Sequence, residues 1–268
     1  MSALHEVFAK ARADDRAVLV GYLPAGFPSR QGGIDALLAM IAAGVDVVEV
    51  GVPYSDPVME GPTIAAAMAV ALAGGATMQD VFETVEAVAN AGIPAVVMSY
   101  WNPIEQYGLD AYAKELAARG GSGVITPDLT PEEAGPWISA TDAHGIDRTF
   151  LVALSSSEAR IATVTAACSG FVYAASVMGV TGARAQVSDG AVGLVERTRA
   201  ATTLPVAVGL GVSNAEQAAQ VASYADGVIV GSAFVRCLLD APNEAAGIAA
   251  AGALAASLAA GVRSVPSR

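Results

Sequence analysis

Short apolar runs alternate with longer helical patterns along the whole chain. Eight runs rich in Val, Ile and Ala have the length of strands: 17–22, 45–50, 95–99, 123–126, 149–153, 171–175, 205–208 and 227–230. Helical patterns lie between them near residues 32–43, 62–73, 80–91, 111–118, 131–144, 158–168, 191–200 and 215–224. Because most runs are continuously apolar, they predict a parallel sheet that is covered by helices.

Eight such units fit a (β/α)₈ barrel, here with an additional N-terminal helix, and a doubly wound open sheet is the second choice. No linker, low-complexity tract or charge run divides the sequence, so residues 1–268 are predicted to form one domain. Active sites of barrels lie where strands end. The segments of interest are therefore 24–28, 51–61, 100–107, 127–130, 154–157, 176–190, 209–214 and 231–233.

Composition narrows the class of protein. The net charge of −12, without clusters of Lys or Arg, argues against nucleic acid and anionic membranes as partners. The polar N-terminus does not resemble a signal peptide, and Cys168 and Cys237 form no disulfide or metal-binding pattern. A cytoplasmic location is expected. The alanine-rich segment 243–260 is predicted to be a helix packed on a soluble domain, with Asn243 as its N-cap, because few of its side chains are large.

Several chemistries lack the residues that they need. The chain has two lysines, Lys10 and Lys114, and neither stands at the C-terminal end of a predicted strand, so Schiff-base catalysis is not expected. The two histidines, His5 and His144, lie in or near helices, and no metal site is predicted. The remaining candidates are carboxylates and tyrosines at strand ends, together with backbone amides.

The strongest chemical signal lies in residues 45–64, where an apolar strand carries Glu49 near its end and the following loop ends in Glu60. A carboxylate buried among apolar side chains has a raised pKa, which suits general acid–base catalysis near neutral pH. A structural glutamate paired with an arginine or with backbone amides fits this pattern equally well.

Three glycine clusters follow the last three predicted strands, at residues 179–182, 209–213 and 231–232. Glycine allows backbone N–H groups to approach an oxyanion, and loops after strands 7 and 8 bind phosphate in many barrels. Ser213 and Ser232 would add hydroxyl donors. The clusters therefore favour a phosphate ligand, although glycines that only form tight turns are the alternative.

These motifs together resemble the tryptophan synthase α subunit along nearly the whole chain. The segments that carry the resemblance are GYLPAGFP at 21–28, VEVGVPYSDP at 48–57, MSYWNP at 98–103, GVTG at 179–182 and GLGVS at 209–213. The resemblance implies a barrel lyase that cleaves indole-3-glycerol phosphate to indole and glyceraldehyde 3-phosphate. It also implies no cofactor in this chain, and an α₂β₂ complex with a β subunit that carries pyridoxal phosphate. Residues 53–59 and 100–107 would contact that subunit, and residues 177–190 would form a lid.

By this resemblance, Glu49 would transfer the protons, and the indole ring would accept the electrons once it is protonated at C3. The family's second acid belongs to an Asp-Gly-Pro-Thr motif, whereas this chain has Glu60-Gly61-Pro62-Thr63. The extra methylene can displace the carboxylate by about 1 Å, and such a shift can cost about 100-fold in rate. If a shifted loop absorbs the methylene, Glu60→Asp lowers the rate; if the acid is misplaced, Glu60→Asp restores the family geometry and raises it. The second outcome is favoured because Pro62 restricts the loop.

The remaining site residues are assigned as substrate contacts. The apolar wall around indole is assigned to Tyr22, Tyr100, Ile125, Leu151 and Tyr173, and the phosphate contacts to Thr181, Gly182, Gly211, Gly231 and Ser232. Asp56 and Asp128 are interpreted as structural or interfacial. Two other functions stay open: another sugar-phosphate barrel enzyme, and a weakly catalytic α-like module that activates a β subunit.

Overall fold

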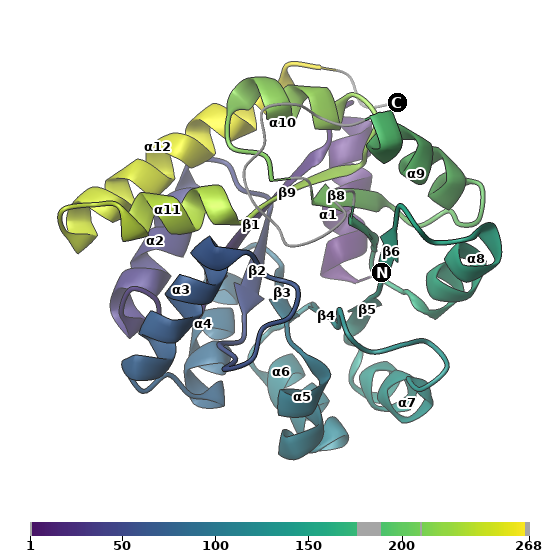
Figure 1. The fold of residues 1–268 in the computed structure, drawn as a ribbon, viewed down its shortest axis with the longest axis horizontal. Coiled ribbons are helices and arrows are strands. Elements are labelled where there is room, and N and C mark those ends of the chain that lie inside the picture. The colour runs from purple at the N-terminus through teal and green to yellow at the C-terminus, as the bar shows by residue number, and fades with distance from the viewer. Residues whose placement is uncertain (1, 176–188, 210, 266–268) are drawn as a thin grey trace.

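The computed structural model describes residues 2–175, 189–209 and 211–265, and its strands form a ring inside a layer of helices (Figure 1). The strands are β1 (Val18–Pro24), β2 (Val47–Gly51), β3 (Ala95–Met98), β4 (Gly123–Ile125), β5 (Asp147–Thr149), β6 (Leu151–Ala153), β7 (Val172–Ala175), β8 (Val206–Gly209) and β9 (Gly227–Val230). They pair in the order β5-β4-β3-β2-β1-β9-β8-β7-β6, and all eight pairings are parallel. The predicted parallel barrel is confirmed.

The barrel closes at Phe150. The prediction of one strand over residues 149–153 is wrong, because β5 pairs only with β4 and β6 pairs only with β7. These two edge strands are consecutive in sequence, so Phe150 joins the edges of the sheet covalently. The Phe150 N–H donates to Cys168 Sγ at 3.3 Å, and the Phe150 carbonyl accepts from the Tyr173 N–H at 3.2 Å. The backbone of Phe150 is therefore hydrogen-bonded at the point where the two edges of the sheet meet.

Twelve helices occur in the described residues, and most match the predicted segments. They are α1 (Ala3–Ala13), α2 (Arg30–Ala42), α3 (Pro62–Ala73), α4 (Met78–Asn90), α5 (Trp101–Tyr107), α6 (Leu109–Ala118), α7 (Gly135–His144), α8 (Glu158–Ala167), α9 (Asp189–Arg199), α10 (Ala215–Ala222), α11 (Ser232–Leu239) and α12 (Glu244–Arg263). Helix α5 was expected to be a loop. Its first N–H, that of Trp101, donates to the side chain of Asp128 at 2.9 Å, which caps the helix from a distant segment.

Local sequence explains most of the other helix ends. Ser29, Asn214 and Asn243 each accept a first-turn N–H through their side chains, as N-caps do. Helix α3 begins with Pro62, which needs no N–H partner at this position. Residues 131–134, predicted as the start of a helix, form a turn before α7 instead.

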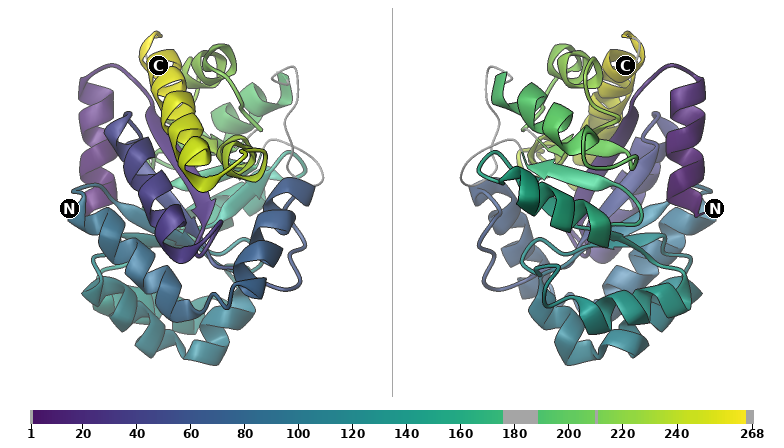
Figure 2. Two further views of the ribbon diagram at one scale, coloured as in Figure 1. Left: turned by 90° about the vertical axis from the view of Figure 1, so that its left-hand side faces the viewer. Right: turned by 90° about the vertical axis from the view of Figure 1, so that its right-hand side faces the viewer.

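Among the described residues, α12 is the one helix that is long and apolar enough to cross a membrane by itself. The bent pair α3 and α4 passes the same test only when the two helices, 110° apart, are taken as one span. Helix α12 packs against α2, α10 and α11, and it lies beside α2 in Figure 2. The predicted packed C-terminal helix and its Asn243 cap are confirmed.

Two apolar layers follow from the alternation of side chains along the strands. In β1, Leu19 and Leu23 pack outward against the helices, whereas Val18 and Val20 belong to a second cluster inside the ring. Helix α1 contributes Leu4 and Phe8 to that inner cluster. In Figure 2, α1 lies at one end of the barrel and α3 at the other. The inner cluster therefore fills the end where the strands begin, and the opposite end is left for a site.

Candidate active site

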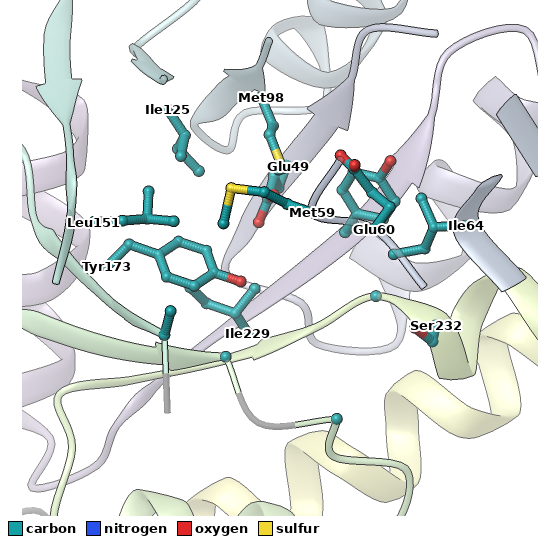
Figure 3. Close-up of a pocket in the computed structure, with 15 residues that line it drawn as sticks. Glu49, Met59, Glu60, Ile64, Met98, Ile125, Leu151, Tyr173, Ile229 and Ser232 are labelled. Atoms are coloured by element: carbon teal, nitrogen blue, oxygen red, sulfur yellow. The ribbon is translucent and has the colours of Figure 1, made fainter. Parts of the chain in front are cut away.

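A cavity of about 850 Å³, counted out to its open mouth, lies at the C-terminal ends of the strands (Figure 3). It is lined by Tyr22, Glu49, Met59, Glu60, Ile64, Met98, Ile125, Leu151, Tyr173, Ala175, Gly209, Gly211, Ile229, Gly231 and Ser232. In the view of Figure 3, Ile125, Leu151 and Tyr173 lie on one side and Ile64 and Ser232 on the other. Most of the wall is apolar, as in typical sites for small molecules.

The strands place several of these side chains by simple alternation. Tyr22, Glu49 and Met98 each follow an inner-cluster valine by two residues, so they point into the same interior one layer higher. Tyr22 on β1 is directly opposite Glu49 on β2. A Cβ at Gly51 would overlap the hydroxyl of Tyr22, so this strand end has room only for glycine beside the tyrosine.

Glu49 is only 2% exposed, and its Oε2 has no hydrogen-bond partner among the described residues. Burial, followed by the charge of Glu60, raises the pKa of Glu49 to about 8. The neighbouring Asp46 is a contrast, because it accepts from Arg16 Nη1 at 2.8 Å and from the Leu19 N–H at 2.9 Å. Asp46 therefore forms the kind of structural ion pair that was one interpretation of Glu49. Glu49 itself has the environment of an acid–base catalyst, which was the other interpretation.

Glu60 is buried but hydrogen-bonded. Burial raises the pKa of Glu60, whereas the hydrogen bond from the Tyr100 hydroxyl and backbone N–H groups of Met59 and Glu60 act in the opposite direction. The same hydroxyl accepts from the N–H of Val58 at 3.0 Å and of Met59 at 2.9 Å. Tyr100 does not line the cavity, contrary to its expected place in the indole wall. It holds Glu60 and the loop before it.

The other predicted wall residues, Tyr22, Ile125, Leu151 and Tyr173, do line the cavity. Six further lining residues were not assigned to the site from the sequence, and they are Met59, Ile64, Met98, Ala175, Gly209 and Ile229. Extending the two-residue alternation along β3 and β9 would have found Met98 and Ile229. Met59 lies in a loop, where no periodic signal exists.

The glycine-rich end of the cavity contains three of the predicted phosphate contacts, Gly211, Gly231 and Ser232. Gly211 has φ of +71°, and Ser232 is the first residue of α11, so first-turn N–H groups stand beside the cavity. Ser213 was expected to add a donor, but its N–H and hydroxyl both donate to Gln217 Oε1, at 2.8 and 3.1 Å. Thr181 and Gly182 lie outside the described residues, as does most of the predicted lid.

The remaining candidates have no place in the cavity. Asp128 caps α5, and Asp56 is an exposed loop residue that accepts from Ser55 Oγ at 2.6 Å. His144 contacts Asp110 at 2.8 Å on the surface. In the described part of the chain, no group of three or more His, Cys, Asp or Glu residues is arranged to hold a metal ion.

Comparison with known proteins gives a consistent answer. The model of the tryptophan synthase alpha chain family matches residues 8–262. The tryptophan synthase alpha chain of Salinispora arenicola is 59% identical over 263 residues, covering 98% of each chain, and that of Acidothermus cellulolyticus is 59% identical over 266 residues, covering 99% of each. A structure of Mycobacterium tuberculosis tryptophan synthase matches with a TM-score of 0.92 at 53% identity, covering 98% of both chains. The chain therefore belongs to the tryptophan synthase α chain family, the lyases that cleave indole-3-glycerol phosphate.

Proposed function

We propose that this chain cleaves indole-3-glycerol phosphate to indole and glyceraldehyde 3-phosphate in the cavity described above, with Glu49 and Glu60 as its catalytic residues. The observation that carries the proposal is the pair of buried carboxylates in an otherwise apolar cavity. Glu49 Oε2 has no hydrogen-bond partner in the described part of the chain and its pKa is raised to about 8, whereas Glu60 accepts a hydrogen bond that stabilises its ionised form. Two carboxyl groups in such different environments are typical of paired acid and base roles.

The first step is protonation of the indole ring. Glu49, whose pKa is raised to about 8, donates its proton to C3 of indole, which accepts it with the electrons of the C2–C3 double bond. Positive charge then develops on the ring nitrogen. Glu60, whose carboxylate form is stabilised by the Tyr100 hydroxyl, accepts the indole N–H and stabilises this charge, which is greater in the transition state than in the substrate.

The second step breaks the carbon–carbon bond. Glu49, now ionised, accepts the proton of the hydroxyl on the glycerol carbon attached to the ring. The O–H electrons form the aldehyde C=O, and the electrons of the C–C bond return to the ring and neutralise its charge. Indole and glyceraldehyde 3-phosphate result, and Glu49 is again protonated, so no cofactor is needed in this chain.

The cavity walls would hold the two halves of the substrate. Ile125, Leu151 and Tyr173 offer an apolar surface for the indole ring, with Tyr22 beside Glu49. Gly211, Gly231 and Ser232 would bind the phosphate through backbone N–H groups and a hydroxyl. Thr181 and Gly182 are proposed to complete the phosphate contacts.

The decisive experiment replaces Glu49 by Gln, which keeps the shape and removes proton transfer. Indole release should fall by about 10²–10⁴-fold, whereas the affinity for glyceraldehyde 3-phosphate should stay within a few-fold of wild type. Retention of more than about a tenth of the wild-type turnover would contradict acid–base catalysis by Glu49.

The proposed partner is a β subunit that carries pyridoxal phosphate, in an α₂β₂ complex in the cytoplasm. The loop before Glu60 supports a protein contact, because Val58 is 72% exposed and the ring of Tyr54 packs on Tyr100 at 5.1 Å. Indole release by the isolated chain should increase when a cognate β subunit is added at micromolar concentration. Absence of a complex by size measurement would remove this part of the proposal.

The Glu at position 60 favours one alternative, a weakly catalytic module whose main role is to activate a β subunit. The same mixing experiment separates the two functions. A module would release almost no indole, alone or in the complex, although the β subunit would still be activated.

A further inference from the structure

The hydroxyl of Tyr100 has three partners, and together they fix its direction. A phenol has one proton and two acceptor positions. The N–H groups of Val58 and Met59 occupy the acceptor positions, at 3.0 and 2.9 Å, so the proton is left for Glu60. The carboxylate must therefore be the acceptor in this contact, which favours the ionised form of Glu60.

The backbone that carries Tyr100 is itself held on both sides. The Ser99 hydroxyl donates to the Tyr100 carbonyl at 2.8 Å, and the next N–H, that of Trp101, is bound by Asp128 at 2.9 Å. The Tyr100 ring is buried and packs on Tyr54. Tyr100 is thus a fixed point at the end of β3, and the loop that ends in Glu60 is attached to it.

We infer that Tyr100 is the positioning residue for Glu60, and that its hydroxyl fits the longer acid of this chain, so that residues 60 and 100 act as one unit in catalysis. The inference rests on the proposed function of Glu60. A hydrogen bond does not survive a displacement of about 1 Å, the scale of one methylene. Asp at position 60 would reach Tyr100 only if the loop moved, and the same hydroxyl holds that loop through Val58 and Met59.

This contact reverses the effect expected for Glu60→Asp from the family motif. The sequence alone suggests that the shorter acid restores a lost geometry and raises the rate. With Tyr100 fixed and Pro62 at the start of α3, the shorter acid instead loses its donor. Glu60→Asp should therefore lower the rate.

The test is a double-mutant cycle of Tyr100→Phe, Glu60→Asp and both together, assayed for indole release alone and with a cognate β subunit. Each single variant should lower kcat by about tenfold or more while KM stays within about threefold, as expected for lost positioning. The double variant should be no more than about threefold slower than the slower single variant, because both remove the same contact. Tyr112→Phe removes a buried hydroxyl of α6 that has no hydrogen-bond partner among the described residues, and it should leave kcat unchanged.

The pH profile gives a readout that a purely structural role would not move. The groups that face Glu60 are Glu49 on β2, Tyr22 on β1, Tyr173 on β7, Asp128 after β4, and Tyr100. Burial and the charge of Asp128 oppose its ionisation, and the Tyr100 hydroxyl favours it. In Tyr100→Phe the pKa of Glu60 should rise, so the acidic limb of kcat/KM should move to higher pH.

Two results would overturn the inference while the proposed function stands: independent, multiplicative effects in the cycle, or Tyr100→Phe with wild-type kcat and an unmoved acidic limb. If Tyr100→Phe does not fold, judged by thermal unfolding, Glu60→Asp alone decides, and a rate at or above wild type rejects the inference. Glu60→Ala distinguishes the positioning role of Tyr100 from the catalytic role of Glu60. Wild-type turnover in that variant would reject the role of Glu60 itself.

Discussion

The two ends of the barrel use the same strands for opposite purposes. At the end where the strands begin, Leu4 and Phe8 of α1 pack on inward-pointing valines and on Phe171, whose ring lies 5.7 Å from that of Phe8. At the other end, the next inward positions are Tyr22, Glu49 and Tyr173. The covered end is mainly an apolar core, although Asp147 Oδ2 at the start of β5 is buried there beside Leu4, whereas the cavity end holds both Glu49 Oε2 and the Tyr22 hydroxyl. None of these three atoms has a hydrogen-bond partner among the described residues.

This difference indicates where the chain gains stability and where it accepts a cost. Burying apolar surface stabilises the fold, but burying a carboxylate or a hydroxyl without a partner destabilises it by about 1–3 kcal/mol or more. A cost of that size is expected where groups must stay available to a substrate. The end covered by α1 should therefore control stability with little effect on catalysis, and the cavity end should do the reverse.

The largest expected effect is that of Phe8→Ala at the covered end. Truncating a buried phenylalanine costs about 3–5 kcal/mol of unfolding free energy, because it removes apolar contacts and leaves a cavity. Urea unfolding should show this loss. The kcat/KM of the folded fraction should stay within about threefold of wild type, since α1 does not line the active-site cavity.

Phe8→Leu is the control, because it replaces most of the volume and should cost under about 2 kcal/mol. A Phe8→Ala protein that unfolds like wild type, or one that is stable but loses most of its kcat/KM, would contradict the division of roles between the two ends.

The second prediction concerns the phosphate end of the cavity. Gly211→Ala adds a methyl group where the backbone faces the cavity, so KM for indole-3-glycerol phosphate should rise by roughly 10–100-fold with a smaller change in kcat. Gly211 has φ of +71°, so the variant also strains the backbone by about 1–2 kcal/mol.

Gly75→Ala is the matched control for that strain. Gly75 has φ of +80°, lies between α3 and α4, and has no atom within 4 Å of an added Cβ. It should lower stability to a similar extent and leave KM unchanged. Equal KM values in the two variants would indicate that Gly211 does not contact the phosphate.

The sequence predicted the barrel because its evidence is repeated along the chain and is local. Each apolar run and each cap, such as Asn243, can be recognised from a few neighbouring residues. The break at Phe150 gave no such signal, since residues 149–153 are apolar after the first threonine and the break depends on which strands pair. Helix α5 was missed because its cap, Asp128, lies 27 residues away in sequence.

The residues of the site were also predicted where their evidence is local in sequence, and missed where it is not. Glu49 was recognised because a carboxylate interrupts an apolar strand, and alternation accounts for Tyr22 and Tyr173 in the same cavity. The contact between Tyr100 and Glu60 joins residues 40 positions apart, through a loop whose path no pattern specifies. Individual inward-pointing residues are therefore predictable, but the hydrogen bonds that orient them are not.

The smallest expected effect, taken over one pH unit, is the pH dependence of stability that Glu49 causes at the cavity end. Its pKa is about 8 in the folded chain and 4.5 as the ordinary value, so between these pH values the folded state keeps a proton that the unfolded state has lost. Stability from this group therefore falls as pH rises through that range. The slope is at most about 1.4 kcal/mol per pH unit for one proton. Glutamine at position 49 does not titrate, so the variant does not lose stability in this way. The unfolding free energy of Glu49→Gln minus that of wild type should therefore increase by about 1 kcal/mol between pH 6 and 7. The difference should level off above pH 8. Urea unfolding of the ligand-free proteins at a series of pH values measures this difference, and a flat or decreasing difference would place the Glu49 pKa near its ordinary value and remove the stability cost assigned to the cavity end.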